Sequence, residues 1–142
     1  MDIKELQSIY AAHPQTAAVA SLIDRGDARS IRLAGLQGSS AAMCTAALFL
    51  KRGGCLLCVM NDLEEAGYFY NDLVQLAGEA SVSFFPSAYH RHIKYGHTDA
   101  ANEVLRTEAL AVLQSDEPNV IIVSYPDAIA ERVLSKNVLK EN

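Results

Sequence analysis

Apolar residues follow two patterns along this chain, and each pattern predicts a kind of secondary structure. Recurrence every three to four residues is typical of a helix with one buried face, whereas short apolar runs and alternations are typical of strands. The helical pattern predicts helices at residues 3–12, 16–23, 39–51, 61–76, 98–114 and 128–133. The strand pattern predicts strands at residues 30–36, 55–60, 81–85 and 120–123. Because strands and helices alternate from residue 30 onward, we expect an α/β fold, with a mainly parallel sheet and helices on both faces.

Local signals refine several of these elements. Pro14 separates the first two helices, and Asn61 is the expected N-cap of the helix at 61–76. The run at 55–60 is apolar throughout, which predicts a central strand covered on both faces. The helix at 98–114 has a row of apolar residues that we expect to form its buried face: Ala101, Leu105, Ala109 and Val112.

The order of elements suggests a short N-terminal part and one larger unit. The helices within residues 1–28 are expected to pack on, or lead into, an α/β subdomain at 29–142. A chain of 142 residues has one domain's length and can bury a substantial core. Residues 134–142 contain no clear closing element, which favours a fragment of a longer multidomain protein. A natural frayed terminus is the alternative.

Composition and charge narrow the classes of function. Apolar residues make up 50% of the chain and charged residues 20%, an ordinary globular composition that excludes a disordered chain. The 17 Asp and Glu outnumber the 12 Lys and Arg, so a net charge of −5 would not hold the protein on DNA or an anionic membrane through its overall field. No apolar stretch fits a membrane span and the N-terminus has no signal-peptide pattern, so we expect a cytoplasmic location.

The cysteines indicate a reducing compartment rather than a redox or metal site. They are odd in number and lie in apolar surroundings typical of reduced buried thiols: Cys44, Cys55 and Cys58. Cys55 and Cys58 have C-x-x-C spacing, but within a strand they would point to opposite faces. Since a redox or zinc pair needs both sulfurs on one side, we expect neither.

The segment after the first predicted strand has the place of a phosphate-binding loop. In nucleotide-binding sheets the amides and helix dipole of such a loop hold phosphate. Aligned with G-x-x-x-x-G-K-[ST], Gly35 fills the first glycine, but Ala41 replaces the lysine that neutralises phosphate and Ala42 the hydroxyl that holds Mg²⁺. We therefore expect no ATP hydrolysis. The remaining loop residues are Leu36, Gln37, Gly38, Ser39 and Ser40, with Ser40 at the second glycine position. The loop forms either a weak anion site or only a tight turn.

Other candidate chemistry is weaker. Asp127 stands too far past the last predicted strand for the carboxylate that holds Mg²⁺ in nucleotide-binding sheets. Ser39 and Ser40 lack the G-x-S-x-G spacing of a nucleophile. His90 and His92 would share a face, with His97 as the nearest third ligand, but no further pattern supports a metal site. Cations interleaved with aromatics can track nucleic acid, and the residues concerned are Tyr89, Arg91, Lys94 and Tyr95. The alternative is a surface loop whose aromatics pack on the sheet edge.

Three blocks of sequence, in order, resemble the N-terminal UvrB-like region of the transcription-repair coupling factor (Mfd) family. The first is Leu-Ala-Gly-Leu-Gln-Gly-Ser-Ser-Ala-Ala at 33–42. The second joins Phe-Pro-Ser-Ala-Tyr at 85–89 to Asp-Ala-Ala-Asn at 99–102 and a Leu-Arg pair ending at Arg106, and it also resembles the excision-repair protein UvrB. The third is Val-Ile-Ile-Val-Ser-Tyr-Pro-Asp-Ala-Ile at 120–129.

This resemblance implies a topology like that of the P-loop NTPases, with a degenerate phosphate loop. The family is an ATP-dependent DNA translocase that displaces stalled RNA polymerase and recruits UvrA for nucleotide excision repair. Its motor, which uses ATP and Mg²⁺, and its partner-binding domains would lie beyond this chain. The chain itself would be the first subdomain, a scaffold without catalysis or cofactor whose partners are other domains of the same parent. UvrB carries a DNA-gripping tyrosine hairpin in the region matching Tyr89 and Tyr95.

The resemblance also changes the role expected of Arg106. Taken alone, Arg106 would form a surface ion pair with Glu103, one helical turn away. The family match suggests a more specific hydrogen-bonding role. Two other functions stay open: a free-standing α/β protein that binds a phosphorylated ligand at residues 35–42, and a small hydrolase, which only the presence of Ser and His supports.

Overall fold

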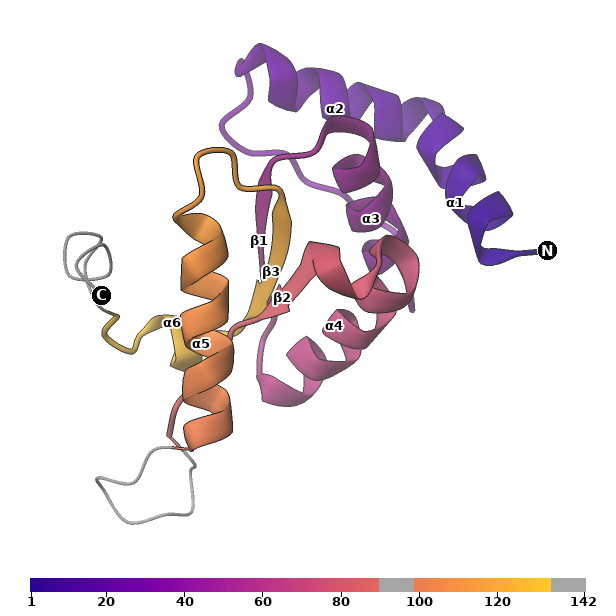
Figure 1. Cartoon of the computed structure of the whole chain (residues 1–142). Helices are drawn as coiled ribbons and strands as arrows, with labels where there is room; N and C mark the ends of the chain where they lie inside the picture. The colour runs from indigo at the N-terminus through magenta and orange to yellow at the C-terminus, as the bar shows by residue number, and fades with distance from the viewer. Residues whose placement is uncertain (90–98, 134–142) are drawn as a thin grey trace.

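The computed structural model describes residues 1–89 and 99–133 (Figure 1). Within them, three parallel strands form one sheet in the order β1-β3-β2. Their bounds are β1 Cys55–Val59, β2 Val82–Phe84 and β3 Val120–Ser124. In the register, Ile121 of β3 lies between Leu56 of β1 and Val82 of β2. Every residue of β3 is buried, because this strand has a neighbour on each edge and helices over each face.

Helices cover the sheet in layers. Their bounds are α1 Ile3–Ala12, α2 Pro14–Arg25, α3 Ser40–Arg52, α4 Leu63–Ala77, α5 Ala100–Leu113 and α6 Pro126–Ile129, with a short 3₁₀ helix η1 at Glu79–Ser81. Helices α3 and α4 lie on one face of the sheet, and α5 lies on the other (Figure 1). Helices α1 and α2 pack outside α3, and α1 contributes no buried residue. The α/β class with helices on both faces of a parallel sheet is therefore confirmed.

Small side chains let α3 and α4 approach the sheet closely. Ala46 of α3 and Ala66 of α4 are fully buried against Ile121 and Val123 of β3, and Leu73 of α4 completes this part of the core. Alanine is also the best helix former, so the Ala-rich segment favours helix and close packing at once. Among the described residues, no helix is both long enough and apolar enough to cross a bilayer.

Most predicted helices are confirmed, with shifted ends. Helix α2 begins at Pro14, which occupies the first helical position instead of separating two helices. The N-cap of α4 is Asp62 rather than Asn61, because the Asp62 carboxylate accepts the amide of Glu65 at 2.8 Å. The predicted helix at 128–133 is wrong in its extent, since α6 starts at Pro126 and ends at Ile129.

Two strand predictions are wrong. Residues 30–36 form no strand and run as an irregular segment between α2 and α3, beside an apolar cavity of about 640 Å³. Within the described residues, β1 pairs only with β3, so it lies at the edge of this sheet rather than at its centre. Its outer-facing residues Cys55, Leu57 and Val59 are exposed, Leu57 by 59%, because the helix on that face, α5, packs against β2. An apolar run predicts a strand but not how many neighbours the strand has.

The turn between α3 and β1 requires a glycine. Gly53 has φ of 63°, and a Cβ there would lie 2.9 Å from Oδ1 of Asn119, which accepts the amide of Gly54. We expect Gly53→Ala to lower the free energy of unfolding by about 1 kcal/mol or more. Gly67 is the matched control, because it lies inside α4 with open space around its Cα, so Gly67→Ala should raise stability by about 0.5–1 kcal/mol. Urea unfolding of both variants measures the difference, and shifts of the same sign would contradict this account.

Candidate functional site

The loop at residues 35–42 forms a turn into α3. Gly35 and Gly38 have φ of 80° and 55°, in the left-handed region that favours glycine. Ser40 closes the turn: the amide of Gln37 donates to Ser40 Oγ, and the Ser40 hydroxyl donates to the Gln37 carbonyl, both at 2.7 Å. Ser39 is the N-cap residue of α3 but makes no side-chain capping bond. The loop's own hydrogen bonds therefore occupy the hydroxyl that stands at the second glycine position.

The two alanines of the loop face different surroundings. Ala42 is 1% exposed and belongs to the core cluster, so its methyl group packs where a phosphate loop would present a hydroxyl to Mg²⁺. Ala41 lines a groove between the N-terminal end of α3 and α4. Neither side chain can neutralise or coordinate a phosphate.

The groove beside the loop has acidic walls. It has a volume of about 600 Å³, and its lining includes Gly38 and Ala41 from the loop side and Glu65 and Asp72 from α4. No Lys or Arg is among its described lining residues. Two carboxylates outweigh the partial positive charge of a helix N-terminus, so the groove disfavours an anion. Asp127, the distant Mg²⁺ candidate, is exposed in the first turn of α6.

A buried polar network centred on Arg106 joins the chain after β2 to the chain after β3. Arg106 of α5 is 7% exposed, and its Nη1 donates to the carbonyls of Pro86 and Ala128, each at 2.9 Å. Nη1 also lies 3.3 Å from Oε2 of Glu131, and the guanidinium carbon is 4.2 Å from the ring centre of Phe85. The expected surface pair with Glu103 is wrong, because the buried face of α5 includes Arg106.

Further hydrogen bonds extend this network, in which only Nη2 of Arg106 is buried without a hydrogen-bond partner among the described residues. The amide of Ala88 donates to Oε2 of Glu131 at 3.0 Å, and the Ser87 hydroxyl donates to the other Glu131 oxygen. The Ser87 amide donates to the Tyr125 hydroxyl at 2.8 Å, and Asn102 Nδ2 donates to the Ser87 carbonyl at 2.9 Å. Buried polar groups with partners of this kind hold one arrangement. The role of Glu131 was missed from sequence, since nothing in its local pattern marks it as a partner of Arg106.

The candidate DNA contacts fall mostly outside the described residues. Tyr89 is exposed by 56% at the end of the described segment that follows β2. The other candidates, Arg91, Lys94 and Tyr95, lie outside the described residues, as do His90, His92 and His97. In the described part of the chain, no three metal-ligating side chains come together.

The cysteines differ in exposure. Cys55 and Cys58 alternate along β1, so they point to opposite faces as predicted, and all three cysteines are free. The prediction that all three are buried is wrong for Cys55, which is exposed at the first position of the strand. Burial raises the pKa of the Cys58 thiol to about 11 and raises the pKa of Cys44 as well.

Comparison of the chain with protein-family models, curated proteins and solved structures gave no match.

The network predicts that Arg106 stabilises the fold far more than a surface arginine. We expect Arg106→Ala to cost about 3–5 kcal/mol, because it leaves the Glu131 carboxylate, whose side chain is only 14% exposed, without its cation. The matched control is Arg52→Ala. Arg52 pairs with Asp24 at 3.0 Å, but the Asp24 side chain is 60% exposed, so the cost should stay below about 1 kcal/mol. Equal costs in urea unfolding would contradict a structural role for the Arg106 network.

The cysteine environments predict a difference in alkylation. At neutral pH, iodoacetamide should modify exposed Cys55 well before Cys58, because only the thiolate attacks and a raised pKa keeps Cys58 protonated. The rate at Cys58 should keep rising as the pH approaches 11. Peptide mass spectrometry over a pH series measures both rates, with Cys55→Ser isolating the slower site. Equal rates at neutral pH would show that Cys58 is accessible.

Proposed function

We propose that this chain is the first, UvrB-like subdomain of a transcription-repair coupling factor. The parent would be an ATP-dependent DNA translocase that displaces stalled RNA polymerase and recruits UvrA, working in the cytoplasm. In this proposal the subdomain has no catalytic activity or cofactor and acts through contacts with other domains of its parent.

One observation carries this proposal: the second and third resembling blocks meet in space. Arg106 of the second block donates to Ala128 of the third, and Tyr125 of the third accepts the amide of Ser87 from the second. Three weak matches in order would be unremarkable if their residues were scattered over the surface. Residues that form one buried network instead have a shared architectural role, as expected of a family's structural signature.

The finer topology is also a proposal. We infer that the three-stranded sheet is one side of a larger sheet with the order of the P-loop NTPases. The free edge of β1 and the exposed side chains of Leu57 and Val59 support this inference, because further strands and a helix would cover them.

The loop supports a non-catalytic role. Ala41 and Ala42 lack the required groups, and the Ser40 hydroxyl is engaged within the turn. Glu65 and Asp72 also make the adjacent groove unfavourable for phosphate. The same carboxylates weigh against the alternative function, a free-standing protein that binds a phosphorylated ligand at residues 35–42.

The size of the native protein tests the proposal first. We expect an antibody against this chain to detect, in an extract of the source cells, a band far larger than 15.4 kDa. The full-length protein isolated with that antibody should then retain UvrA and RNA polymerase. Pre-immune serum and antibody blocked with the purified 142-residue chain are the controls.

A native band near 15.4 kDa would overturn the parent-protein proposal. The non-catalytic part has a separate test. ATP turnover by the purified chain that is lost in Ser39→Ala or Ser40→Ala would contradict it.

A further inference from the structure

The groove between α3 and α4 has features of a docking site that the proposed function does not use. It lies past the carboxyl end of β1, with Met60 and Phe69 in its lining. Tyr68 of α4 also lines it and is exposed by 68%, an unusual exposure for an aromatic ring beside apolar neighbours. Tyr68 makes no contact with another ring in the described part of the chain. The groove therefore offers apolar and aromatic surface that no other part of the described chain covers.

Acidic side chains bracket this ring. Glu64, Tyr68 and Asp72 are spaced four residues apart on α4, so they form a row along one side of the helix. Asp72 also lines the groove, as does Glu65, one turn before Tyr68. The ring thus lies between carboxylates on the helix surface.

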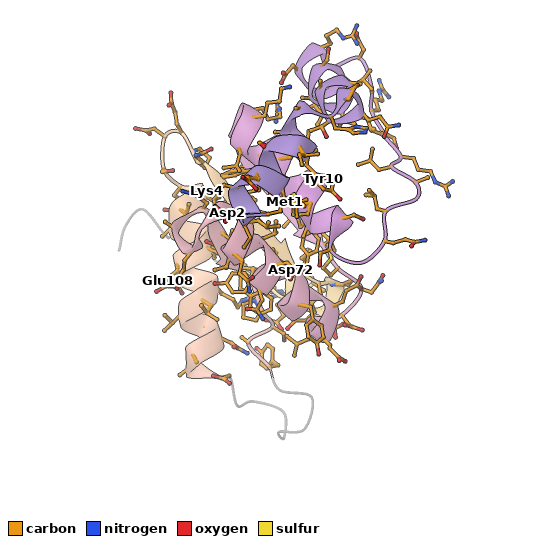
Figure 2. The ribbon with its side chains drawn as sticks, turned by 90° about the vertical axis from the view of Figure 1, so that its right-hand side faces the viewer. Met1, Asp2, Lys4, Tyr10, Asp72 and Glu108 are labelled. Carbon is orange, nitrogen blue, oxygen red and sulfur yellow. The ribbon has the colours of Figure 1, made fainter. Side chains whose placement is uncertain are left out.

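The chain has little positive charge near this surface in sequence. Between Arg52 and Arg91 there is no Lys or Arg, whereas the same stretch has five acidic residues: Asp62, Glu64, Glu65, Asp72 and Glu79. Within residues 1–89 and 99–133, neither Glu64 nor Asp72 forms an ion pair. Figure 2 shows Asp72 on α4. The buried arginine, Arg106, belongs to α5 and pairs with Glu131. No Lys or Arg therefore lines the groove or pairs with Glu64 or Asp72 in the described part of the chain.

This combination selects a cationic side chain as the occupant. An arginine or lysine can lie over the exposed tyrosine face while its charged group meets the carboxylates, and its aliphatic stem can pack against the apolar lining. Phosphate groups of nucleic acids and anionic lipids would be repelled by the same carboxylates. We propose that the groove between α3 and α4 docks an arginine- or lysine-bearing segment of a partner protein. This inference does not rest on the proposed function.

A labelled peptide tests the inference directly. The probe is a short fluorescein-labelled peptide in which arginine alternates with leucine, and its control has glutamate in place of every arginine. We expect saturable binding of the arginine peptide to the 142-residue chain by fluorescence anisotropy, weakening as salt is raised. Tyr68→Ala should weaken binding about fivefold, whereas Tyr68→Phe, which keeps the ring, should change it less than about twofold. Since Tyr68 is exposed, neither change should unfold the protein.

A matched charge change separates docking from general attraction to an acidic protein. Asp72→Asn should weaken binding about threefold, whereas Glu108→Gln, an equal charge change on the exposed surface of α5, should leave it within error. Amide chemical shifts that change on titration should map to α4 and the end of β1. Absence of saturable binding, an equal effect of Glu108→Gln, or shifts confined to another surface would each overturn the proposal.

A second copy of the chain is the alternative occupant, because the segment after α2 contains Arg29 and Arg32. Sedimentation of the chain without peptide distinguishes the two cases. A monomer that binds the peptide supports docking of a partner protein. Self-association that disappears in Tyr68→Ala would overturn it, since the groove would then hold another copy of the same chain.

Discussion

Complete burial of β3 is the constraint on which the rest of this structure depends. A strand buried on both faces must place its backbone polar groups on neighbouring strands, and β1 and β2 supply those bonds in parallel register. Because the strands are parallel, the chain leaves β2 and β3 at the same end of the sheet. The segments that follow, Pro86 after β2 and the short helix α6 with Ala128 after β3, therefore lie near each other and bring carbonyl groups into the interior. Those carbonyls need donors that the sheet cannot provide.

Arg106 meets that need, and its own burial then requires Glu131. One nitrogen of its guanidinium, Nη1, donates to carbonyls from both segments, whereas Nη2 is buried without a hydrogen-bond partner among the described residues. Burying its charge carries a desolvation cost of several kcal/mol, which the Glu131 carboxylate and the face of Phe85 offset. An apolar residue of similar size would fill the same space but leave the carbonyls of Pro86 and Ala128 without donors. The ion pair is therefore better understood as fixing the relative position of the segment after β2 and helix α6 than as a net source of stability.

The sequence predicted the elements better than their surroundings. The Val-Ile-Ile-Val run and the helices at α1, α3, α4 and α5 were all identified, because local spacing records which face of an element is apolar. In the described sheet β1 lies at the edge and not at the predicted centre. The apolar pattern could not show this, because Leu57 is as apolar as Ile121 of β3 and only the position of α5 distinguishes their burial. The helical pattern alone also placed Arg106 at the surface, and only the family resemblance suggested the hydrogen-bonding role that the structure shows. A charged residue does not contribute to an apolar pattern, so the pattern cannot predict its burial. Its partner Glu131 is also distant in sequence. For the loop at residues 35–42, the sequence shows directly that the lysine is missing. It does not show that Glu65 and Asp72 of α4 line the groove beside the loop, because this depends on how α3 and α4 pack.

Those carboxylates change how the loop at residues 35–42 should be understood. A loop that leads into a helix N-terminus can present amides to an anion, helped by about half a unit of positive charge at that end of the helix. Here two full negative charges, on Glu65 and Asp72, line the space beside that turn. A lysine at residue 41 would face those carboxylates and pair with them, so it would not by itself recreate a phosphate site. The acidic side chains of α4 thus make the electrostatic potential in the groove negative. The loop and the groove together form a surface suited to a cation.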